Sequence, residues 1–176
     1  MSQLSWPGEL DAPLVETCVH ELLDDAATRF PDNDAVVSTA QGQRLTFFQL
    51  RSAARQAAQA LNRHGIGKGD RVGIWSANRI EWIIVQFAAS EIGAILVTVN
   101  PAYREEELAY VVGHSGCKAL FLSPKFRTFD CMEAAARVQE LHPSLELLVH
   151  FDHLRHGRIP SGGAMLEAEA PPVRQS

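Results

Sequence analysis

Two periods of hydrophobicity run along this chain, and they predict its secondary structure. Residues 14–30 repeat apolar side chains at helical spacing, and Pro31 ends that predicted helix. The apolar residues on its shared face are Val15, Val19, Leu22, Leu23, Ala26 and Phe30. The following segments, "DNDAVVST" and "QGQRLTF", predict two short strands joined by a turn.

A second helix is predicted from a capping pattern rather than from periodicity alone. Thr46 with Gln49 has the capping-box spacing, and we expect the helix to run through His64. The residues expected on its buried stripe are Leu50, Ala54, Ala57 and Leu61. Those expected to face water are Arg51, Arg55, Gln59 and Arg63.

Beyond this helix, short apolar runs alternate with helical segments. Strands are predicted near residues 72–76, 94–99, 118–122 and 146–150. Helices are predicted over about 79–92, 104–114 and 129–141, the first of them capped by Asn78. Continuous apolar strands separated by helices indicate parallel strands buried on both faces. The predicted fold class is therefore α/β, a mostly parallel sheet flanked by helices on both faces, with a strand order that the sequence leaves undetermined.

The chain has 176 residues, enough for one domain with its own core. We expect an amino-terminal extension over residues 1–13 and an α/β subdomain over residues 14–155. Residues 156–176 are rich in Gly and Pro and are predicted to form a surface segment with a frayed end.

Charge and cysteine content narrow the classes of function. The formal net charge of −5 argues against a general nucleic-acid-binding protein, because phosphate binding needs clustered basic residues. No apolar run is long enough to span a bilayer, and the first residues lack the basic pattern of a signal or transit peptide. Cys18, Cys117 and Cys131 show no C-x-x-C spacing, which favours reduced cysteines. These features predict a cytoplasmic protein.

Gly65, Gly67, Lys68 and Gly69 form the segment most similar to a phosphate-binding loop. A phosphate loop follows a strand and opens a helix, so that free N–H groups meet the anion. Here the glycines follow a predicted helix and precede a predicted strand, and no Ser or Thr after Lys68 is available to hold magnesium. Gly65 suits a left-handed helix end. The segment is therefore interpreted as a turn.

A histidine group near the end of the chain is the candidate metal site. It consists of His142, His150, His153 and His156, with Asp152 among them. A structural zinc site usually needs four ligands at defined spacing, which this group lacks. We therefore interpret these histidines as exposed and unliganded.

Three other segments have structural interpretations as well. The acids of "REEEL" at 104–108 complement the dipole at the start of a helix, and Ser161-Gly162-Gly163 follows no predicted strand. Trp75, Trp82 and Phe87 fit packing positions in the core. No nucleophile, base and oxyanion site come together. The predicted catalytic, cofactor-binding and metal-binding residues are accordingly none, and the substrate-binding residues are unknown.

An ordered series of residue types extends through "LTFFQL", "KGDRVGIWSANRIEW" and "VNPAYREEELAYVVGHSGCKALF". Its members are Thr46, Phe47, Leu50, Ala60, Leu61, Gly65, Gly69, Asp70, Arg71, Val72, Asn78, Glu81, Ala88, Gly93, Ala94, Asn100, Pro101, Tyr103, Glu107, Leu108, Tyr110 and Ser115. The series resembles the amino-terminal region of acyl-CoA synthetases of the adenylate-forming, AMP-binding superfamily. The resemblance covers about residues 14–151 and is closest to the fatty-acyl and medium-chain branch.

The resemblance implies a parent ligase that uses ATP, Mg and coenzyme A. Such an enzyme joins a carboxylic acid to AMP, releases pyrophosphate, and then transfers the acyl group to the thiol of coenzyme A. The family's phosphate loop, its aromatic-x-x-Thr-Glu motif, its ribose-binding Asp and its carboxy-terminal Lys do not occur in these 176 residues. The phosphate loop is expected just beyond Ser176.

The resemblance therefore implies an amino-terminal fragment that is inactive alone and binds no cofactor by itself. Its expected partner is the remainder of the parent ligase, with a fatty acid as the parent's substrate and self-association left open. We also expect exposed apolar surface on the isolated fragment, because further segments of the parent would pack on this sheet. Two alternatives remain: a non-catalytic interaction module derived from such a ligase, and a fragment of an aryl- or amino-acid-activating enzyme.

Overall fold

The computed structural model describes residues 16–154, and a four-stranded parallel sheet lies at the centre of this part. The strand order is β4-β3-β5-β8, so the first of the four strands in the chain lies in the interior of the sheet. The strands are β3 Arg71–Trp75, β4 Ile95–Val99, β5 Cys117–Leu122 and β8 Leu147–His150. This pairing confirms the prediction that the four apolar segments share one parallel sheet.

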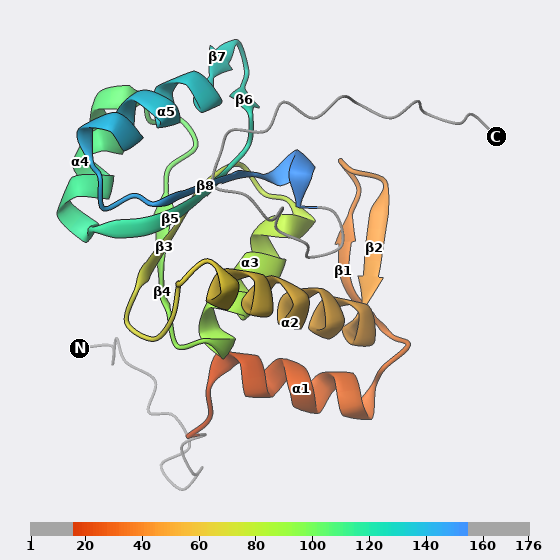
Figure 1. The fold of residues 1–176 in the computed structure, drawn as a ribbon. Coiled ribbons are helices and arrows are strands. Elements are labelled where there is room, and N and C mark those ends of the chain that lie inside the picture. Colours follow the sequence, from red (N-terminus) through yellow and green to blue (C-terminus); the bar gives the residue numbers. More distant parts are fainter. Residues whose placement is uncertain (1–15, 155–176) are drawn as a thin grey trace, which may run out of the picture.

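Helices cover both faces of this sheet, as predicted (Figure 1). One face packs against α2 and α3, and the other packs against α4 and α5. A further helix, α1, lies against α2 and α3 on the side away from the sheet (Figure 1). The helices are α1 Val19–Arg29, α2 Phe47–Arg63, α3 Ile80–Glu91, α4 Glu105–Ser115 and α5 Cys131–Leu141.

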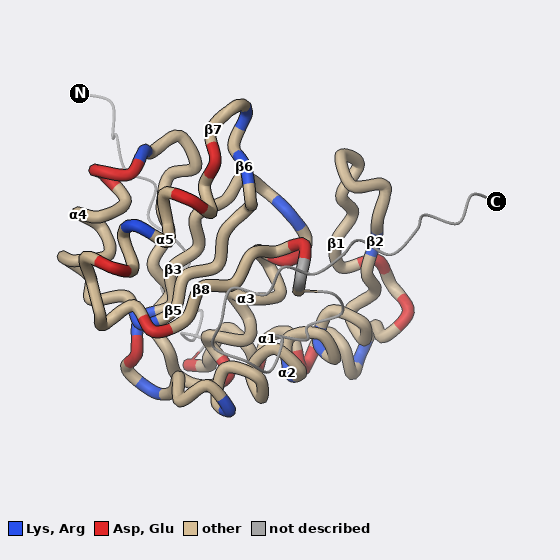
Figure 2. The backbone as a smooth tube through the Cα atoms, turned by 45° about the horizontal axis from the view of Figure 1, so that its top comes forward, with Lys and Arg blue, Asp and Glu red and all other residues tan. Residues whose placement is uncertain are grey.

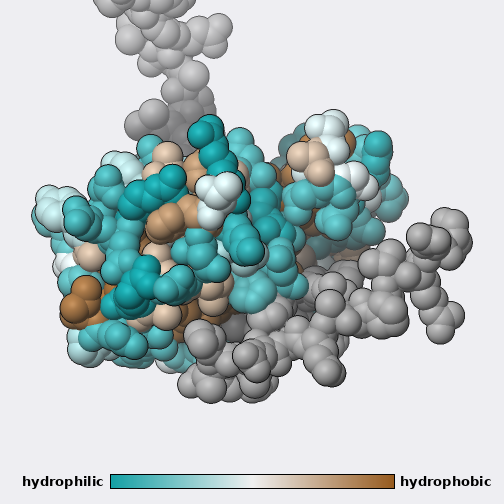
Figure 3. All heavy atoms as spheres, turned by 90° about the horizontal axis from the view of Figure 1, so that it is seen from above, coloured by the Kyte–Doolittle hydropathy of each residue, from teal (hydrophilic) through white to brown (hydrophobic). Residues whose placement is uncertain are grey.

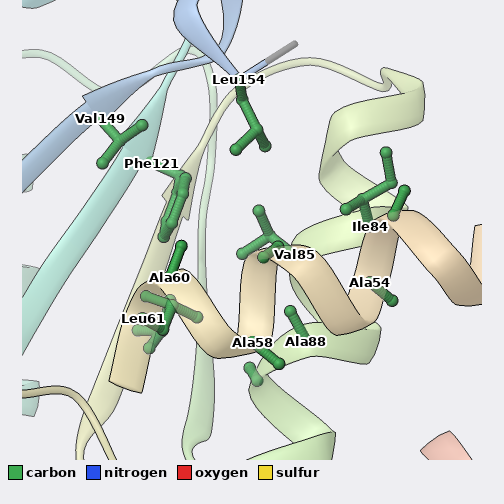
Figure 4. Close-up of a cluster of buried hydrophobic side chains, with 14 of the residues drawn as sticks. Ala54, Ala58, Ala60, Leu61, Ile84, Val85, Ala88, Phe121, Val149 and Leu154 are labelled. Atoms are coloured by element: carbon green, nitrogen blue, oxygen red, sulfur yellow. The ribbon is translucent and has the colours of Figure 1, made fainter. Parts of the chain in front are cut away.

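Alternate residues of each strand belong to different cores. Phe121 of β5 is fully buried in the core beneath α2 and α3, whereas its neighbours Leu120 and Leu122 are buried beneath α4 and α5. Figure 4 shows Phe121 and Val149 converging with Leu154 and with side chains of α2 and α3. Burial on both faces explains why these strands are continuous apolar runs in the sequence.

Two small antiparallel hairpins stand outside the sheet. The first pairs β1 Asp34–Ser38 with β2 Gln43–Thr46, and it stands to one side of the sheet in Figure 1. The second pairs β6 Lys125–Phe126 with β7 Phe129–Asp130, and the sequence analysis did not predict it. A short 3₁₀ helix, η1 Phe151–His153, follows β8.

Helix α2 has the predicted start and the predicted buried stripe. Gln49 N–H donates to Thr46 Oγ1 at 3.2 Å, and Thr46 N–H donates to Gln49 Oε1 at 2.9 Å, which completes the capping box. The stripe of Leu50, Ala54, Ala57 and Leu61 is buried. Arg55, Gln59 and Arg63 are exposed as expected, whereas Arg51 is partly buried and lies over the Phe48 ring.

Helix α1 differs from its prediction in the face that it buries. The helix packs through Leu23 and Ala27, whereas Val19, Leu22 and Phe30 are exposed by 48%, 53% and 44%. The predicted apolar face is therefore mostly the solvent-facing side of the helix in this structure. Its first member, Val15, lies outside the described residues.

The predicted domain boundaries stay predictions. Residues 14 and 155 lie outside the described range, and so do the extension over 1–13 and the Gly- and Pro-rich segment over 156–176. No helix within residues 16–154 is long and apolar enough to cross a membrane. Basic and acidic residues are interspersed along this part of the chain (Figure 2).

Candidate functional site

The carboxyl ends of β3 and β5 form the topological switch point of the sheet. The connection from β3 leads to β4 on one side, and the connection from β5 leads to β8 on the other. In open α/β sheets, ligands usually bind in the crevice where the strand order reverses in this way. Ser76 follows β3 and Ser123 follows β5, so the sheet brings these two residues to the same place.

The two serine side chains are hydrogen-bonded to each other. Ser76 Oγ and Ser123 Oγ are 2.5 Å apart, and Ser76 Oγ also donates to the Ala77 carbonyl at 2.8 Å. Because a hydroxyl has one proton, Ser123 is the donor in the pair. Ser76 is only 6% exposed, and Ser123 N–H donates to the Trp75 carbonyl at 3.3 Å. The pair therefore fastens the ends of two neighbouring strands.

Arg79 organises the polar groups beside this point. Its Nη2 donates to Asp152 Oδ1 at 2.9 Å, its Nε donates to Glu81 Oε2 at 3.2 Å, and its guanidinium lies over the Phe151 ring at 5.6 Å. Burial acts to lower the pKa of Arg79, but the hydrogen bonds to Glu81 and Asp152 outweigh it and raise the pKa. Arg79 thus joins the start of α3 to the segment after β8.

The N-terminus of α3 is capped from the β1–β2 hairpin and not by Asn78. Gln41 Oε1 accepts from Ile80 N–H at 2.9 Å, while Gln41 Nε2 donates to Glu81 Oε2 at 3.0 Å. The cap residue is Arg79, and its own side chain accepts no capping hydrogen bond. The prediction of an Asn78 cap was wrong because a residue about forty positions away supplies the acceptor.

A groove of about 970 Å³ opens beside these contacts. Its walls come from the β1–β2 hairpin, the first half of α2, the start of α3 and the segment after β8. The side chains that matter for its chemistry are Gln43, Phe48, Gln49, Ser52, Gln56 and Leu154. Seen from above, the surface is mostly hydrophilic with hydrophobic side chains set among polar ones (Figure 3).

The glycine loop joins α2 to β3, which confirms its interpretation as a turn. Gly65 has a φ of 73° where α2 ends, and Lys68 is exposed. Asp70 Oδ2 accepts from Gly67 N–H at 2.9 Å, and that backbone hydrogen bond lowers the pKa of the Asp70 carboxyl. Lys118 of β5 donates to the Gly65 carbonyl at 2.8 Å. The loop lies where β3 begins, at the edge of the sheet opposite the switch point.

The structure separates the histidines of the candidate metal site. His142 precedes β8 and packs its ring against Gly113 of α4, whereas His150 ends β8. Both are half-buried by these positions, so the prediction that they are exposed was wrong for these two. Asp152 is held by Arg79, and the His153 side chain and His156 lie outside what the structure describes. Within residues 16–154, no group of three or more His, Cys, Asp or Glu side chains could hold a metal ion.

The acids at the start of α4 have structural roles, as expected. Glu107 Oε2 accepts from Arg104 N–H at 2.9 Å, and Glu105 Oε2 accepts from Arg137 of α5 at 2.6 Å. The guanidinium of Arg104 lies 4.3 Å from the centroid of the Phe129 ring. These contacts position α4 and α5 and do not assemble a carboxylate pair for catalysis.

The aromatic residues belong to the core, which confirms their interpretation. Trp75 is 1% exposed, and its Nε1–H donates to the Asn100 carbonyl at 3.1 Å. Trp82 and Phe87 are partly buried against the core under α2 and α3. Ser161-Gly162-Gly163 lies outside the described residues.

The residues that the sequence analysis missed are those at the carboxyl edge. Ser76 ends "RVGIWS" and Ser123 ends "KALFLS", so each directly follows a predicted apolar strand. Parallel strands place their carboxyl ends at one edge of the sheet. A serine directly after each of two such strands therefore indicated that Ser76 and Ser123 lie close together. Arg79 and Gln41 carried no such signal, because their partners lie far away in the sequence.

A family model described as AMP-binding enzyme matches residues 23–174. The chain belongs to the AMP-binding enzyme family. In this family, the "Medium-chain acyl-CoA ligase ACSF2, mitochondrial" of Mus musculus is 37% identical over 164 residues, which cover 93% of this chain and 26% of that protein. The chain therefore spans about a quarter of the length of this relative.

Two solved structures share the fold. The N-terminal domain of FACL13 from Mycobacterium tuberculosis has a TM-score of 0.69 at 22% identity, covering 88% of this chain and 39% of that chain. The anthranilate CoA ligase AuaEII, solved in complex with anthranoyl-AMP, has a TM-score of 0.71 at 22% identity, covering 83% of this chain and 27% of that chain. These likenesses concern the fold alone.

The described residues do not fit ATP or Mg. The loop with Lys68 leads from a helix into a strand, so its N–H groups do not lie at a helix N-terminus. The carboxylates of Asp and Glu, which Mg²⁺ prefers among side chains, do not form a cluster of three within residues 16–154. We therefore assign no step of adenylate chemistry to a side chain of this part of the molecule.

Proposed function

We propose that this chain is the amino-terminal subdomain of an ATP-dependent fatty-acyl-CoA ligase of the medium- or long-chain type. The observation that carries the proposal is the 37% identity to the mouse medium-chain ligase over 93% of this chain. In the complete ligase, the acid would form an acyl-adenylate with release of pyrophosphate, and coenzyme A would then displace AMP. ATP, Mg and coenzyme A belong to that complete enzyme.

The contribution of this chain to the reaction is a scaffold. The Ser76–Ser123 pair fixes the carboxyl ends of β3 and β5, and Arg79 fixes the start of α3 to the segment after β8. A rigid edge of this kind can hold later segments in register, because catalytic groups must be positioned to within a fraction of an ångström. The residues that touch the nucleotide would come from the remainder of the ligase, which is the proposed partner.

A chimeric enzyme tests this proposal. Residues 23–174 would replace the matching segment of the mouse medium-chain ligase, and thioester formation would be measured with ATP, Mg, coenzyme A and a medium-chain fatty acid. We expect a folded chimera that retains thioester formation. A folded chimera without activity, beside an active parent, would contradict the proposal and leave the non-catalytic module as the better interpretation.

A second recipient separates the two acid classes. The same residues would replace the matching segment of the anthranilate CoA ligase, with anthranilate as the acid. If the chain belongs to the fatty-acyl branch, we expect the second chimera to lose more activity than the first. The reverse order would favour an aryl-acid ligase as the parent.

We also propose that the protein works in the cytoplasm. Cys18, Cys117 and Cys131 are all free thiols, which suits a reducing compartment. The mouse relative is named as mitochondrial, so cell fractionation is the direct test. Recovery of the protein with the mitochondrial fraction would contradict this location.

A further inference from the structure

The lining of the groove beside the β1–β2 hairpin combines apolar side chains, here called its floor, with polar side chains, here called its rim. Phe48 and Ile84 contribute apolar surface, and Phe48 is 53% exposed. The rim carries the amides of Gln43, Gln49 and Gln56. Side-chain amides both donate and accept hydrogen bonds, as peptide groups do. A groove with this lining suits an extended polypeptide, whose backbone bonds to the rim while an apolar side chain enters the floor.

The chain itself leaves the described part of the molecule at this groove. Leu154 lines the groove, is 2% exposed, and points into the cluster shared by α2 and α3 (Figure 4). Its N–H donates to the Phe151 carbonyl at 2.9 Å, which fixes its backbone against η1. The residues after Leu154 therefore start at the wall of the groove. A tethered segment has a far higher effective concentration at such a site than a free partner has.

We propose that residues 155–166, "RHGRIPSGGAML", occupy this groove with Ile159 as the apolar anchor. Ile159 is five residues beyond Leu154, so it can reach up to about 17 Å from it. Pro160 biases Ile159 toward an extended backbone, the conformation that an amide-lined groove accepts. Gly162 and Gly163 then allow the chain to turn away. The inference does not depend on the proposed function, because the tether lies within this chain.

Charge is complementary between the rim and the segment. Glu81 and Asp152 share one cation, Arg79. The other cation of the groove lining, Arg44, is paired with Asp34. These paired groups hold three acidic and two basic side chains, so this part of the rim has an excess of one negative charge. The segment begins with Arg155 and contains Arg158, and it has no acidic residue before Glu167. Attraction between unlike charges favours the segment in the groove and is weakened by salt.

Thiol labelling of the full chain tests the proposal. The background carries Cys18→Ser, which removes the exposed native thiol while Cys117 and Cys131 stay buried. Ser52→Cys places a thiol in the groove wall, and Gln59→Cys places one on the exposed side of the same helix as a matched control. We expect Ser52→Cys to react at least about fivefold more slowly than Gln59→Cys, because the docked segment must open first.

The anchor is then removed in both labelled variants. Ile159→Asp is expected to raise the Ser52→Cys rate at least about fivefold and to leave the Gln59→Cys rate unchanged. Equal Ser52→Cys rates with and without Ile159→Asp would overturn the proposal. Protection of Ser52→Cys that disappears on dilution would overturn it as well, because a second copy of the chain would then cover the groove.

A disulfide provides a second readout that does not rely on labelling rates. The pair Ser52→Cys and Ile159→Cys should form an intramolecular disulfide in dilute monomer under mild oxidation. The matched pair Gln59→Cys and Ile159→Cys should not. Formation of neither disulfide, or of both to the same extent, would contradict docking at the groove.

Discussion

The four-stranded sheet and the β1–β2 hairpin differ in how completely they are covered. In the sheet, Val72, Ile74 and Phe121 are 0% exposed, with helices packed on both sides. On the hairpin side, Val37 and Phe48 are 52% and 53% exposed. The side chains of the sheet are as buried as those of a complete domain core. The hairpin, in contrast, leaves apolar side chains exposed on one face.

This difference leaves apolar side chains uncovered by residues 16–154 on the hairpin side and on α1. A two-stranded hairpin is marginal on its own. Here Ala35, Val36 and Leu45 pack against the core, and Gln41 adds hydrogen bonds to the start of α3. Exposed apolar side chains also follow α1, at Val19, Leu22 and Phe30. The prediction placed exposed apolar surface on the sheet, and there it was wrong, because helices cover both of its faces. Within residues 16–154, single apolar side chains are exposed on α1 and on the hairpin side instead.

The largest expected difference in stability loss is between shortening an apolar side chain in the sheet and shortening one in the hairpin. Phe121→Ala should lower the free energy of unfolding by about 3–5 kcal/mol, because it leaves a cavity beside Phe151 in the core. Val37→Ala in the hairpin should change it by less than about 0.5 kcal/mol. Denaturant melts of both variants give the two values. Similar losses would mean that the hairpin is as tightly packed as the sheet.

The next largest difference in stability loss is expected within the glycine loop, between a substitution that strains the backbone and one that only shortens a side chain. Gly65→Val should cost roughly 1–2 kcal/mol, because a β-branched residue is disfavoured at a φ of 73°. A Cβ at this position meets no atom within 4 Å, so the cost comes from the backbone alone. Lys68→Ala should stay within about 0.5 kcal/mol. Urea melts measure both changes, and saturable ATP binding that Lys68→Ala abolishes would contradict the turn interpretation.

Gln41 in the hairpin turn is hydrogen-bonded to the start of α3, one of the helices that cover the sheet. Gln41→Ala removes the hydrogen bonds to Ile80 N–H and Glu81, and we expect a loss of about 1 kcal/mol in stability. Backbone amides of β1 and β2 should exchange faster with solvent, while those of β3 and β5 keep their protection. Gln43→Ala, at an exposed position of the same hairpin, is the control. Faster exchange in Gln43→Ala alone would show that the link was assigned to the wrong residue.

The smallest expected effect is a pH dependence at the glycine loop. Gly67 N–H lowers the pKa of Asp70 in the folded state, so the carboxylate stabilises the fold at neutral pH. That stabilisation is present above the unfolded value of about 4 and is lost as the pH falls through the lower folded value. Asp70→Asn should reduce the acid-side slope of stability against pH. An unchanged slope between neutral and acidic pH would remove Asp70 from this role.

The sheet could be predicted from the sequence because its strands are buried on both faces. Runs such as "RVGIWS" and "KALFLS" have polar residues only at their first and last positions, and a continuous apolar centre is typical of parallel strands. Their order could not be predicted, because it depends on which way each helical connection crosses the sheet. Strands β6 and β7 have two residues each, too few to show any period.

The errors share one physical cause, which is contact between distant segments. Asn78 has the right residue type and position to cap α3, yet Gln41 supplies the acceptor from the hairpin turn. Helix α1 has its strongest apolar pattern on one side, yet Leu23 and Ala27 are the residues that meet the neighbouring helices. The polar groups around Arg79 likewise come together only in the fold.

The central claim is that this chain provides scaffold and that the adenylating groups lie elsewhere in the ligase. The direct measurement is pyrophosphate release by this chain with ATP, Mg and a medium-chain fatty acid, at several chain concentrations. The mouse ligase under the same conditions is the positive control. We predict no release above background, because positioned donors around the transferring phosphate supply most of the rate in such reactions. Release that rises in proportion to the concentration of this chain would contradict the claim.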